Sequence, residues 1–361
     1  MIKLLIVDDS ALMRRQLSTL FEAEGGFEVR LARNGREAIE ENNLFQPDVV
    51  TLDINMPEMD GLTALSMIMV QRPVPVVMVS SLTEKGALAT FEALNLGAVD
   101  YLVKPSGTIS LSLDVIRDSI ISKVRTAAKA RLKPARRSTV VTPPATTPRV
   151  AAQRELADAP RAPIVRRRAG SDGVVVVGVS TGGPRTLELI LPRLPADFPW
   201  PVLVAQHMPA SFTLSFAQRL NDVCPLEVVE ANRPMALEAG TIYIGKGGAD
   251  MLVVQRNGKP TVIAKPENPE FLWHPSVEVL GRSVLEHYDP ARVLAVMLTG
   301  MGYDGADAFA DIKKRGGRTI AESEESCVVF GMPAELINRG GASVTLHAEK
   351  IALQINAWVG C

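Results

Sequence analysis

The stretch Val174-Val-Val-Val-Gly-Val-Ser180-Thr-Gly-Gly-Pro184 is an apolar run that ends in the pattern Gly-x-Ser-x-Gly. Small residues on both sides of Ser180 allow a tight turn from a strand into a helix. Such a turn would expose the hydroxyl as a nucleophile and aim backbone N–H groups at an oxyanion. The pattern is weak by itself, because glycine-rich turns of this kind more often cradle phosphate or simply close a turn. Its interpretation therefore depends on finding a base and an acid elsewhere in the chain.

A base for Ser180 is available at the end of a second apolar run. His207 directly follows residues 202–206, so a parallel sheet would bring it to the edge that carries Ser180, and we take it as the general base. His274, which precedes Pro275 at an expected helix start, is kept as the alternative base.

The acid that would orient the imidazole follows a third apolar run. Residues 293–298 lead into Thr299-Gly-Met-Gly-Tyr-Asp304-Gly, a loop whose glycines permit close approach of the backbone and direct Asp304 toward the same edge. The order serine, histidine, aspartate differs from that of α/β-hydrolases, so the likeness to their nucleophile turn is local. The residues thus predict an acyl-transfer centre on a doubly wound sheet.

Length and composition indicate two ordinary domains of a soluble globular protein. The chain has 361 residues, 47% of them hydrophobic and 22% charged, with a formal net charge of -1. This charge gives no general attraction to nucleic acid.

No apolar run approaches the roughly 20 residues that span a bilayer, and no signal peptide is recognisable, so we expect a cytoplasmic protein without membrane insertion. The three cysteines are far apart and suit neither a disulfide framework nor a C-x-x-C zinc site.

Apolar runs alternate with amphipathic stretches in both halves of the chain, which predicts parallel α/β sheets. In the first half, residues 1–125, five runs predict a flavodoxin-like, five-stranded sheet with strands at 4–7, 28–31, 49–52, 76–79 and 101–103. Residues 126–172 are rich in proline, alanine and arginine, and we interpret them as a flexible linker with no binding role. Residues 173–361 predict a doubly wound α/β domain. Short β runs within 226–265 suggest a β-hairpin insertion on it.

Polar side chains follow the expected strands of the first half. Asp8 and Asp9 come after the first strand and Asp53 after the third, while Ser80 and Lys104 follow the fourth and fifth. Each residue alone has an ordinary explanation, such as a helix N-cap or a surface lysine. All of them at the carboxyl ends of parallel strands indicate a binding site. Three neighbouring carboxylates with only oxygen donors favour a hard cation such as Mg²⁺.

This arrangement, together with the signature Thr51-Leu-Asp53-Ile-Asn55-Met-Pro-Glu-Met-Asp-Gly61, resembles the receiver domain of two-component response regulators. The resemblance covers about residues 1–125 and implies phosphorylation of Asp53 by a histidine kinase. It implies further roles for residues of the same pocket: Mg²⁺ held by Asp8, Asp9, Asp53 and the backbone carbonyl of Asn55, the phosphoryl group contacted by Ser80 and Lys104, and an aromatic switch at Tyr101.

Four motifs of the second half, in this order, resemble the chemotaxis protein-glutamate methylesterase family. They are Gly178-Val-Ser-Thr-Gly-Gly183, Gln206-His-Met-Pro209, Leu298-Thr-Gly-Met-Gly-Tyr-Asp-Gly305 and Val329-Phe-Gly-Met-Pro333. A receiver tethered to such an esterase is that family's own architecture, so the resemblance covers nearly the whole chain.

The resemblance implies hydrolysis of glutamyl methyl esters on the cytoplasmic helices of chemoreceptors, the methyl-accepting chemotaxis proteins, and deamidation of receptor glutamines. Ser180, His207 and Asp304 would form the triad, and the backbone N–H groups of Thr181 and Met301 would hold the oxyanion. We expect no metal or organic cofactor at this centre. We further expect the unmodified receiver to pack over the Ser180 edge, with phosphorylation of Asp53 weakening that packing.

Two positions depart from the family pattern. The family usually has histidine after its proline-glycine-glycine turn, where this chain has Asp250, and arginine before its Pro-Ser-Val run, where this chain has His274. Both changes flank the expected substrate groove, so they leave receptor preference and deamidation open.

Other functions remain possible at this point. The second half could be a module in which residues 178–183 cradle a phosphate or nucleotide, although Ser180 stands where a dinucleotide fingerprint needs glycine. It could also be an esterase with another substrate. A transcriptional regulator is disfavoured, because the second half has no helix-turn-helix pattern or basic recognition helix.

Overall fold

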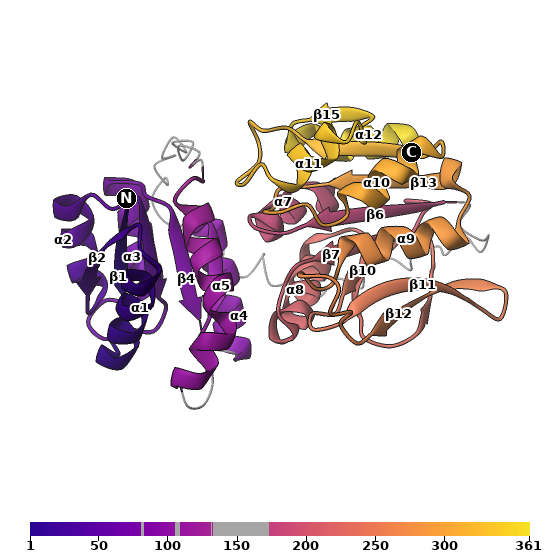
Figure 1. The fold of residues 1–361 in the computed structure, drawn as a ribbon. Coiled ribbons are helices and arrows are strands. Elements are labelled where there is room, and N and C mark those ends of the chain that lie inside the picture. Colours follow the sequence, from indigo (N-terminus) through magenta and orange to yellow (C-terminus); the bar gives the residue numbers. More distant parts are fainter. Residues whose placement is uncertain (81–82, 105–108, 131, 133–172) are drawn as a thin grey trace, which may run out of the picture.

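The computed structural model describes residues 1–80, 83–104, 109–130, 132 and 173–361. These residues form two α/β units that lie side by side (Figure 1). Most of the expected linker, residues 131 and 133–172, falls outside the described residues.

The first unit is a parallel five-stranded sheet in the order β2-β1-β3-β4-β5. Its strands are β1 Ile2–Val7, β2 Phe27–Ala32, β3 Val49–Asp53, β4 Val76–Ser80 and β5 Asp100–Val103. Its helices are α1 Ala11–Glu24, α2 Gly35–Phe45, α3 Gly61–Gln71, α4 Glu84–Leu96 and α5 Ile109–Ala127. The central strands β3 and β4 are buried along their whole length, which explains why both are mainly apolar, with polar residues only at Thr51, Asp53 and Ser80. All five predicted strands are confirmed, each within two residues at either end.

Helices of the first unit begin where short polar side chains can accept backbone N–H groups. The side chains of Ser10, Asn34, Asp60 and Thr83 cap α1 to α4 in this way. Asp8 and Asp9 lie in the loop between β1 and α1, and Asp53 is the last residue of β3, so the acidic cluster stands where these strands end.

The second unit is a parallel seven-stranded sheet in the order β15-β14-β13-β6-β7-β10-β8. Its strands are β6 Val174–Val179, β7 Val202–Gln206, β8 Glu227–Ala231, β10 Thr241–Gly245, β13 Val293–Met297, β14 Arg318–Glu322 and β15 Val344–Leu346. The α-helices are α7 Gly183–Ile190, α8 Ala210–Val223, α9 Val277–His287, α10 Ala306–Lys314, α11 Met332–Asn338 and α12 Ala348–Val359. Two short 3₁₀ turns, η1 Leu191–Arg193 and η2 Pro290–Arg292, complete the unit. Strands β6, β7 and β13 are adjacent, so the three loops that carry Ser180, His207 and Asp304 share one sheet edge.

The β-rich insertion is smaller than the sequence suggested. Strands β11 Asp250–Arg256 and β12 Lys259–Lys265 pair antiparallel, and β9 Met235–Ala236 adds a third strand. Residues 226–229 and 241–244 were expected in the insertion, but β8 and β10 extend the main parallel sheet. The reason is that β10 is buried throughout between two neighbouring strands, and a local pattern does not reveal its partner.

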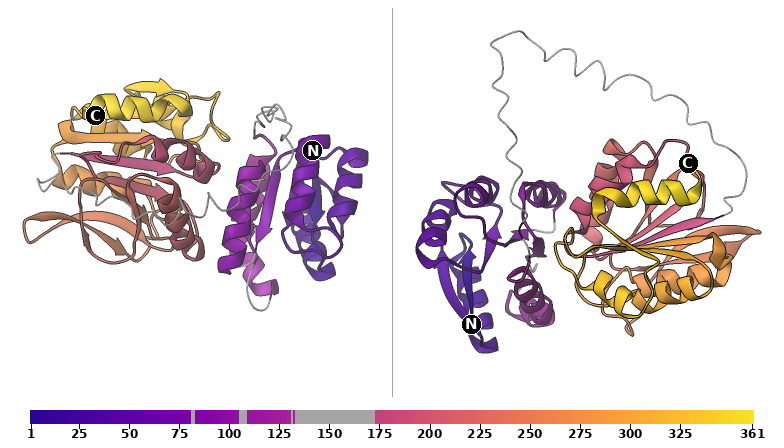
Figure 2. Two further views of the ribbon diagram at one scale, coloured as in Figure 1. Left: turned by 180° about the vertical axis from the view of Figure 1, so that it is seen from behind. Right: turned by 90° about the horizontal axis from the view of Figure 1, so that it is seen from above.

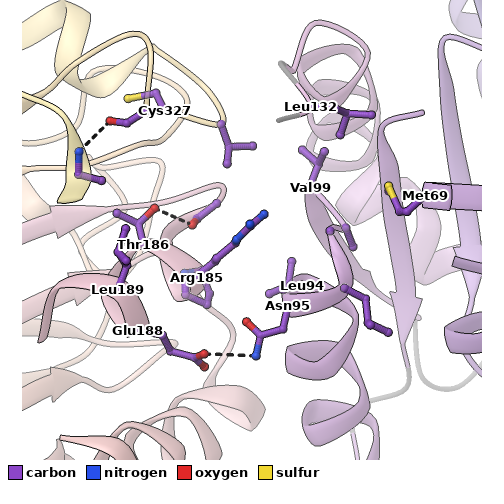
Figure 3. A pocket seen from close by; sticks show the side chains of 18 of the residues that line it. Met69, Leu94, Asn95, Val99, Leu132, Arg185, Thr186, Glu188, Leu189 and Cys327 are labelled. Carbon is purple, nitrogen blue, oxygen red and sulfur yellow. Dashed lines mark hydrogen bonds between the residues drawn. The ribbon is translucent and has the colours of Figure 1, made fainter. Parts of the chain in front are cut away.

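The two units contact each other along one side of each (Figure 2). The ring of Phe91 on α4 lies 5.4 Å from that of Phe216 and 6.2 Å from that of Phe212, both on α8. Both units also line a cavity of about 800 Å³, with Leu94 and Val99 facing Arg185 and Leu189 across it (Figure 3). The interface is thus well packed in one part and open in another.

None of the helices in the described part of the chain combines the length and apolar character that crossing a membrane requires.

Candidate active site

Ser180 lies in the turn between β6 and α7. Its N–H donates a 3.0 Å hydrogen bond to the carbonyl of Thr299, so the turn is tied to the loop after β13. Gly182 has φ of 80°, a left-handed conformation that favours glycine, and lets the chain enter α7. A Cβ on Gly300 would lie 2.7 Å from the Cβ of Ser180, so only glycine there lets the two loops approach this closely.

The imidazole of His207 pairs with the carboxylate of Asp304. His207 Nε2 and Asp304 Oδ2 are 2.8 Å apart, and both side chains are buried, with 7% and 3% exposed. These residues are 97 positions apart in sequence. His207 and Asp304 are the base and the acid that the sequence analysis paired. The alternative base, His274, contacts the carboxylate of Asp250 instead.

The remaining ring nitrogen of His207 is Nδ1. With Nε2 used by Asp304, Nδ1 is the acceptor of the neutral imidazole; it is shielded from solvent and has no hydrogen-bond partner in the described structure. Ser180 and His207 line the same small cavity. The nitrogen that can take a proton from a group in this cavity is therefore Nδ1.

Asp304 is held ionised by four hydrogen bonds. Its Oδ2 accepts from Val277 N–H at 2.7 Å as well as from His207, and its Oδ1 accepts from Ser276 Oγ and Glu278 N–H, each at 3.0 Å. Burial alone would raise the pKa of Asp304. The hydrogen bond and charge of His207 and the backbone donors outweigh burial, so its pKa lies below the ordinary value. A buried anion at this place favours the imidazolium that forms when His207 accepts a proton.

The first unit covers this edge. Thr181 Oγ1 donates a 2.7 Å hydrogen bond to Asp100 Oδ2, and Asp100 Oδ1 accepts from Lys123 Nζ at 3.0 Å. The sulfur of Met301 accepts from Thr126 Oγ1 at 2.7 Å. Thr181 and Met301, both predicted to hold the oxyanion, thus contact β5 and α5. Asp100 and Lys123 also line the cavity of Ser180.

The predicted acidic pocket is assembled at the carboxyl end of the first sheet. One oxygen each of Asp8, Asp9 and Asp53 lie within 4.8 Å of one another. Lys104 Nζ lies 2.9 Å from Asp8 Oδ2 and 2.8 Å from Asp53 Oδ2. Burial raises the pKa of Asp53 to about 6; the Lys104 hydrogen bond opposes this shift and the charge of Asp8 adds to it. Three carboxylates around one point, with one ammonium beside them, are a donor set that fits Mg²⁺.

Three other predicted residues of this unit have different surroundings; the backbone of Asn55 forms a hydrogen bond with Asp53. Ser80 Oγ donates to the Gly86 carbonyl at 3.1 Å, and Asn55 is exposed beside the pocket. Tyr101 is buried and stacks on Phe212 of the second unit, with ring centroids 4.9 Å apart. The predicted switch residue is therefore part of the contact between the units.

Sequence reasoning placed residues 274–278 at a helix start beside the expected substrate groove but missed that they support Asp304. Ser276, Val277 and Glu278 supply three of its four hydrogen bonds, and the ring of Trp273 stacks on that of His207 at 5.9 Å. The pattern Ser-Val-Glu at a helix start predicts an N-terminus with free N–H groups, but nothing local indicates which anion they bind.

Comparisons with known proteins agree with this architecture. A family described as CheB methylesterase matches residues 175–355, and one described as response regulator receiver domain matches residues 4–115. A protein-glutamate methylesterase/protein-glutamine glutaminase of Rhodospirillum rubrum is 56% identical, over 99% of this chain and 96% of its own length. Another with this name from Rhodopseudomonas palustris is 49% identical, over 99% and 98%.

A solved structure agrees as well. The CheB methylesterase catalytic domain of Thermotoga maritima is 38% identical, covers 53% of this chain and 98% of its own, and has a TM-score of 0.50. With two family models matched in sequence and relatives aligned over almost its full length, this chain belongs to the CheB methylesterase family and carries a response regulator receiver domain.

Proposed function

We propose that this chain hydrolyses methyl esters of glutamyl residues, and deamidates glutamines, on the cytoplasmic helices of chemoreceptors, under control of phosphorylation at Asp53. Residues 1–125 would be the regulatory domain, 126–172 the linker and 173–361 the catalytic domain, in a cytoplasmic protein. The observation that carries the proposal is the 2.8 Å contact between His207 Nε2 and Asp304 Oδ2, which leaves Nδ1 as the free base in the cavity of Ser180.

In the proposed reaction, the oxygen of Ser180 attacks the ester carbonyl while His207 Nδ1 takes its proton. Asp304 stabilises the imidazolium. The N–H groups of Thr181 and Met301 hold the oxyanion, where one such donor contributes about 2.7 to 4 kcal/mol. The tetrahedral intermediate collapses, and the methoxide leaves as methanol with the proton from His207. Water then attacks the acyl-serine by the same steps and releases the carboxylate. A glutamine follows the same path with ammonia as the leaving group.

Control by the first domain follows from the same contacts. Asp100 and Lys123 line the cavity of Ser180, and Phe91 and Tyr101 pack on α8, so a receptor helix would have to displace this domain to reach the nucleophile. Phosphorylation of Asp53 by a histidine kinase replaces its carboxylate, beside Lys104, with an acyl phosphate that carries a charge of about -1.5 to -2. Reorganisation of the loops around Lys104 would move β5, which carries both Asp100 and Tyr101, and loosen the interface.

Mg²⁺ would be held by Asp8, Asp9, Asp53 and the carbonyl of Asn55. The ion would supply charge neutralisation for the incoming phosphoryl group at Asp53. The protein's own contribution is Lys104, whose ammonium already lies between the carboxylates of Asp8 and Asp53.

The test is methanol release from methylated receptor by the full chain and by Ser180→Ala, with and without a phosphoryl donor. We expect release by the wild type that increases with the donor, and none above background by the variant. Retention of activity in a folded Ser180→Ala variant would remove the nucleophile. Release unaffected by the donor would remove the regulatory part of the proposal.

A further inference from the structure

Two buried carboxylates hold the same short segment of chain. The segment, residues 273–278, leads into the first turn of α9. Asp250, the first residue of β11, binds its beginning, and Asp304 binds its end. The carboxylate of the candidate triad is thus linked through this segment to a second carboxylate that lies outside the triad.

Asp250 is 2% exposed and accepts three hydrogen bonds. Its Oδ1 accepts from His274 Nδ1 and from Ser276 N–H, each at 2.8 Å, and its Oδ2 accepts from Asn268 N–H at 2.9 Å. A buried carboxylate with three donors fixes all of them, because loss of the acceptor leaves buried donors unpaired.

Ser276 connects the two carboxylates directly. Its N–H donates to Asp250, and its hydroxyl donates to Asp304 at 3.0 Å. The next two N–H groups of the segment, on Val277 and Glu278, also bind Asp304. A displacement of the segment therefore changes three of the four hydrogen bonds that hold Asp304, and through Asp304 the orientation of His207.

The segment also contacts the imidazole itself. The ring of Trp273 lies nearly parallel to that of His207, with an interplanar angle of 10° and centroids 5.9 Å apart. Tyr303 packs edge-on against the same indole at 5.4 Å. His274, next to Trp273, is the side chain through which Asp250 fixes this end of the segment.

We infer that Asp250 and His274 are positioning residues: their hydrogen bond fixes residues 273–278 and thereby sets the geometry of Asp304 and His207. The two positions that depart from the family pattern are the two partners of this bond, so they act as a pair in this chain. Neither side chain is assigned a contact with substrate. The inference rests on the proposed role of Ser180 as nucleophile, and not on the identity of the ester.

The test uses a fluorophosphonate probe on the full chain with Mg²⁺ and a small-molecule phosphoryl donor. Ser180 Oγ forms a bond to phosphorus, fluoride leaves, and His207 takes the serine proton, so the labelling rate reports nucleophile activation without any receptor. We expect Asp250→Asn and His274→Ala to slow labelling on the order of tenfold or more, because small misalignments of reacting groups are costly. His274→Asn should retain most of the rate, since its amide N–H can replace Nδ1–H.

Matched controls separate positioning from general disturbance. His287→Asn on α9 and Asp222→Asn on α8 make the same chemical changes away from the segment and should label like wild type. For methanol release, kcat should be lower in Asp250→Asn and in His274→Ala than in the wild type, while KM should stay nearly constant. The far-ultraviolet and near-ultraviolet circular dichroism of each variant shows whether it is folded; if Asp250→Asn is not, the comparison of His274→Ala with His274→Asn decides.

Labelling of folded His274→Ala at the wild-type rate overturns the inference, and so does equally slow labelling of His274→Asn. If Ser180 is labelled in the expected order of variants but no receptor ester is cleaved, the inference stands and the proposed substrate fails. Absence of Ser180 labelling in the wild type overturns both.

Discussion

Thr181 and Asp100 are joined by a buried hydrogen bond of 2.7 Å, although they are 81 positions apart and belong to different units of the chain. Thr181 follows the candidate nucleophile directly. The residue that would hold the oxyanion is therefore tied to the regulatory unit by a charged acceptor.

We predict that Asp100→Ala raises the methanol release of the unphosphorylated full chain several-fold. A hydrogen bond to a charged group contributes about 1.5 to 3 kcal/mol, so its loss should shift the interface toward separation. The control is Asn95→Ala, which removes an exposed 3.2 Å bond to Glu188 across the same interface and should change the rate little, as exposed contacts do. If, without a phosphoryl donor, Asp100→Ala releases methanol no faster than the wild type, this contact does not restrain the catalytic unit.

Asp304→Asn should lower kcat for methanol release by about 10³ to 10⁴-fold while KM changes little. The amide removes the anion that stabilises protonated His207 and favours the other tautomer of the ring. Asp307→Asn is the matched control, since Asp307 lies one turn away at an exposed ion pair with Arg339. Initial rates over a range of receptor concentrations separate the two constants. Near-normal kcat in folded Asp304→Asn would contradict the assigned role.

The raised pKa of Asp53 makes receiver stability depend on both pH and Mg²⁺. Because the folded-state pKa is about 6, above its ordinary value of 3.8, this residue stabilises the folded chain at acid pH, and that contribution is lost as pH rises through 6. Without metal, Asp53→Asn should therefore raise Tm at pH 7.5, and the gain should shrink toward pH 5.

Mg²⁺ should reverse this order at pH 7.5, since it binds the ionised wild-type pocket and stabilises the folded state. Thermal unfolding of both chains at the two pH values, with and without Mg²⁺, gives all four comparisons. A Tm difference between the chains that is the same under all conditions would exclude this account of the acidic pocket.

The thiols should differ sharply in reactivity. Cys224 and Cys327 are buried, and burial raises the pKa of Cys224 to about 12, whereas Cys361 is exposed. A disulfide reagent should therefore modify one thiol per native chain and three after unfolding. Rapid modification of a native Cys361→Ser variant would show that a buried thiol is accessible.

Much of this architecture could be predicted from the sequence. The apolar strand β6 and the glycines around Ser180 have local causes, namely burial on both faces and the backbone conformation of a tight turn. Parallel topology then brings strand ends together, and this general rule placed Asp8, Asp53 and Lys104 in one pocket.

Other features depend on which distant groups meet, and no local pattern determines that. Periodicity shows that β10 is a strand but not that it pairs with β7 and β8. A histidine in a sequence has two equivalent candidate nitrogens, and only the position of Asp304 decides that Nε2 is bound and Nδ1 is left as the base.

The sequence by itself determined which reactive side chains stand at strand ends. These are a serine, a histidine and an aspartate at the ends of three buried strands, and a carboxylate cluster at the end of another sheet. Tertiary structure alone decided that Asp250 and His274, two isolated departures from a family pattern, are hydrogen-bonded partners beneath the Asp304 segment. The physical reason is that strand burial acts over a few neighbouring residues, whereas a buried carboxylate takes its donors from whichever chains fold around it.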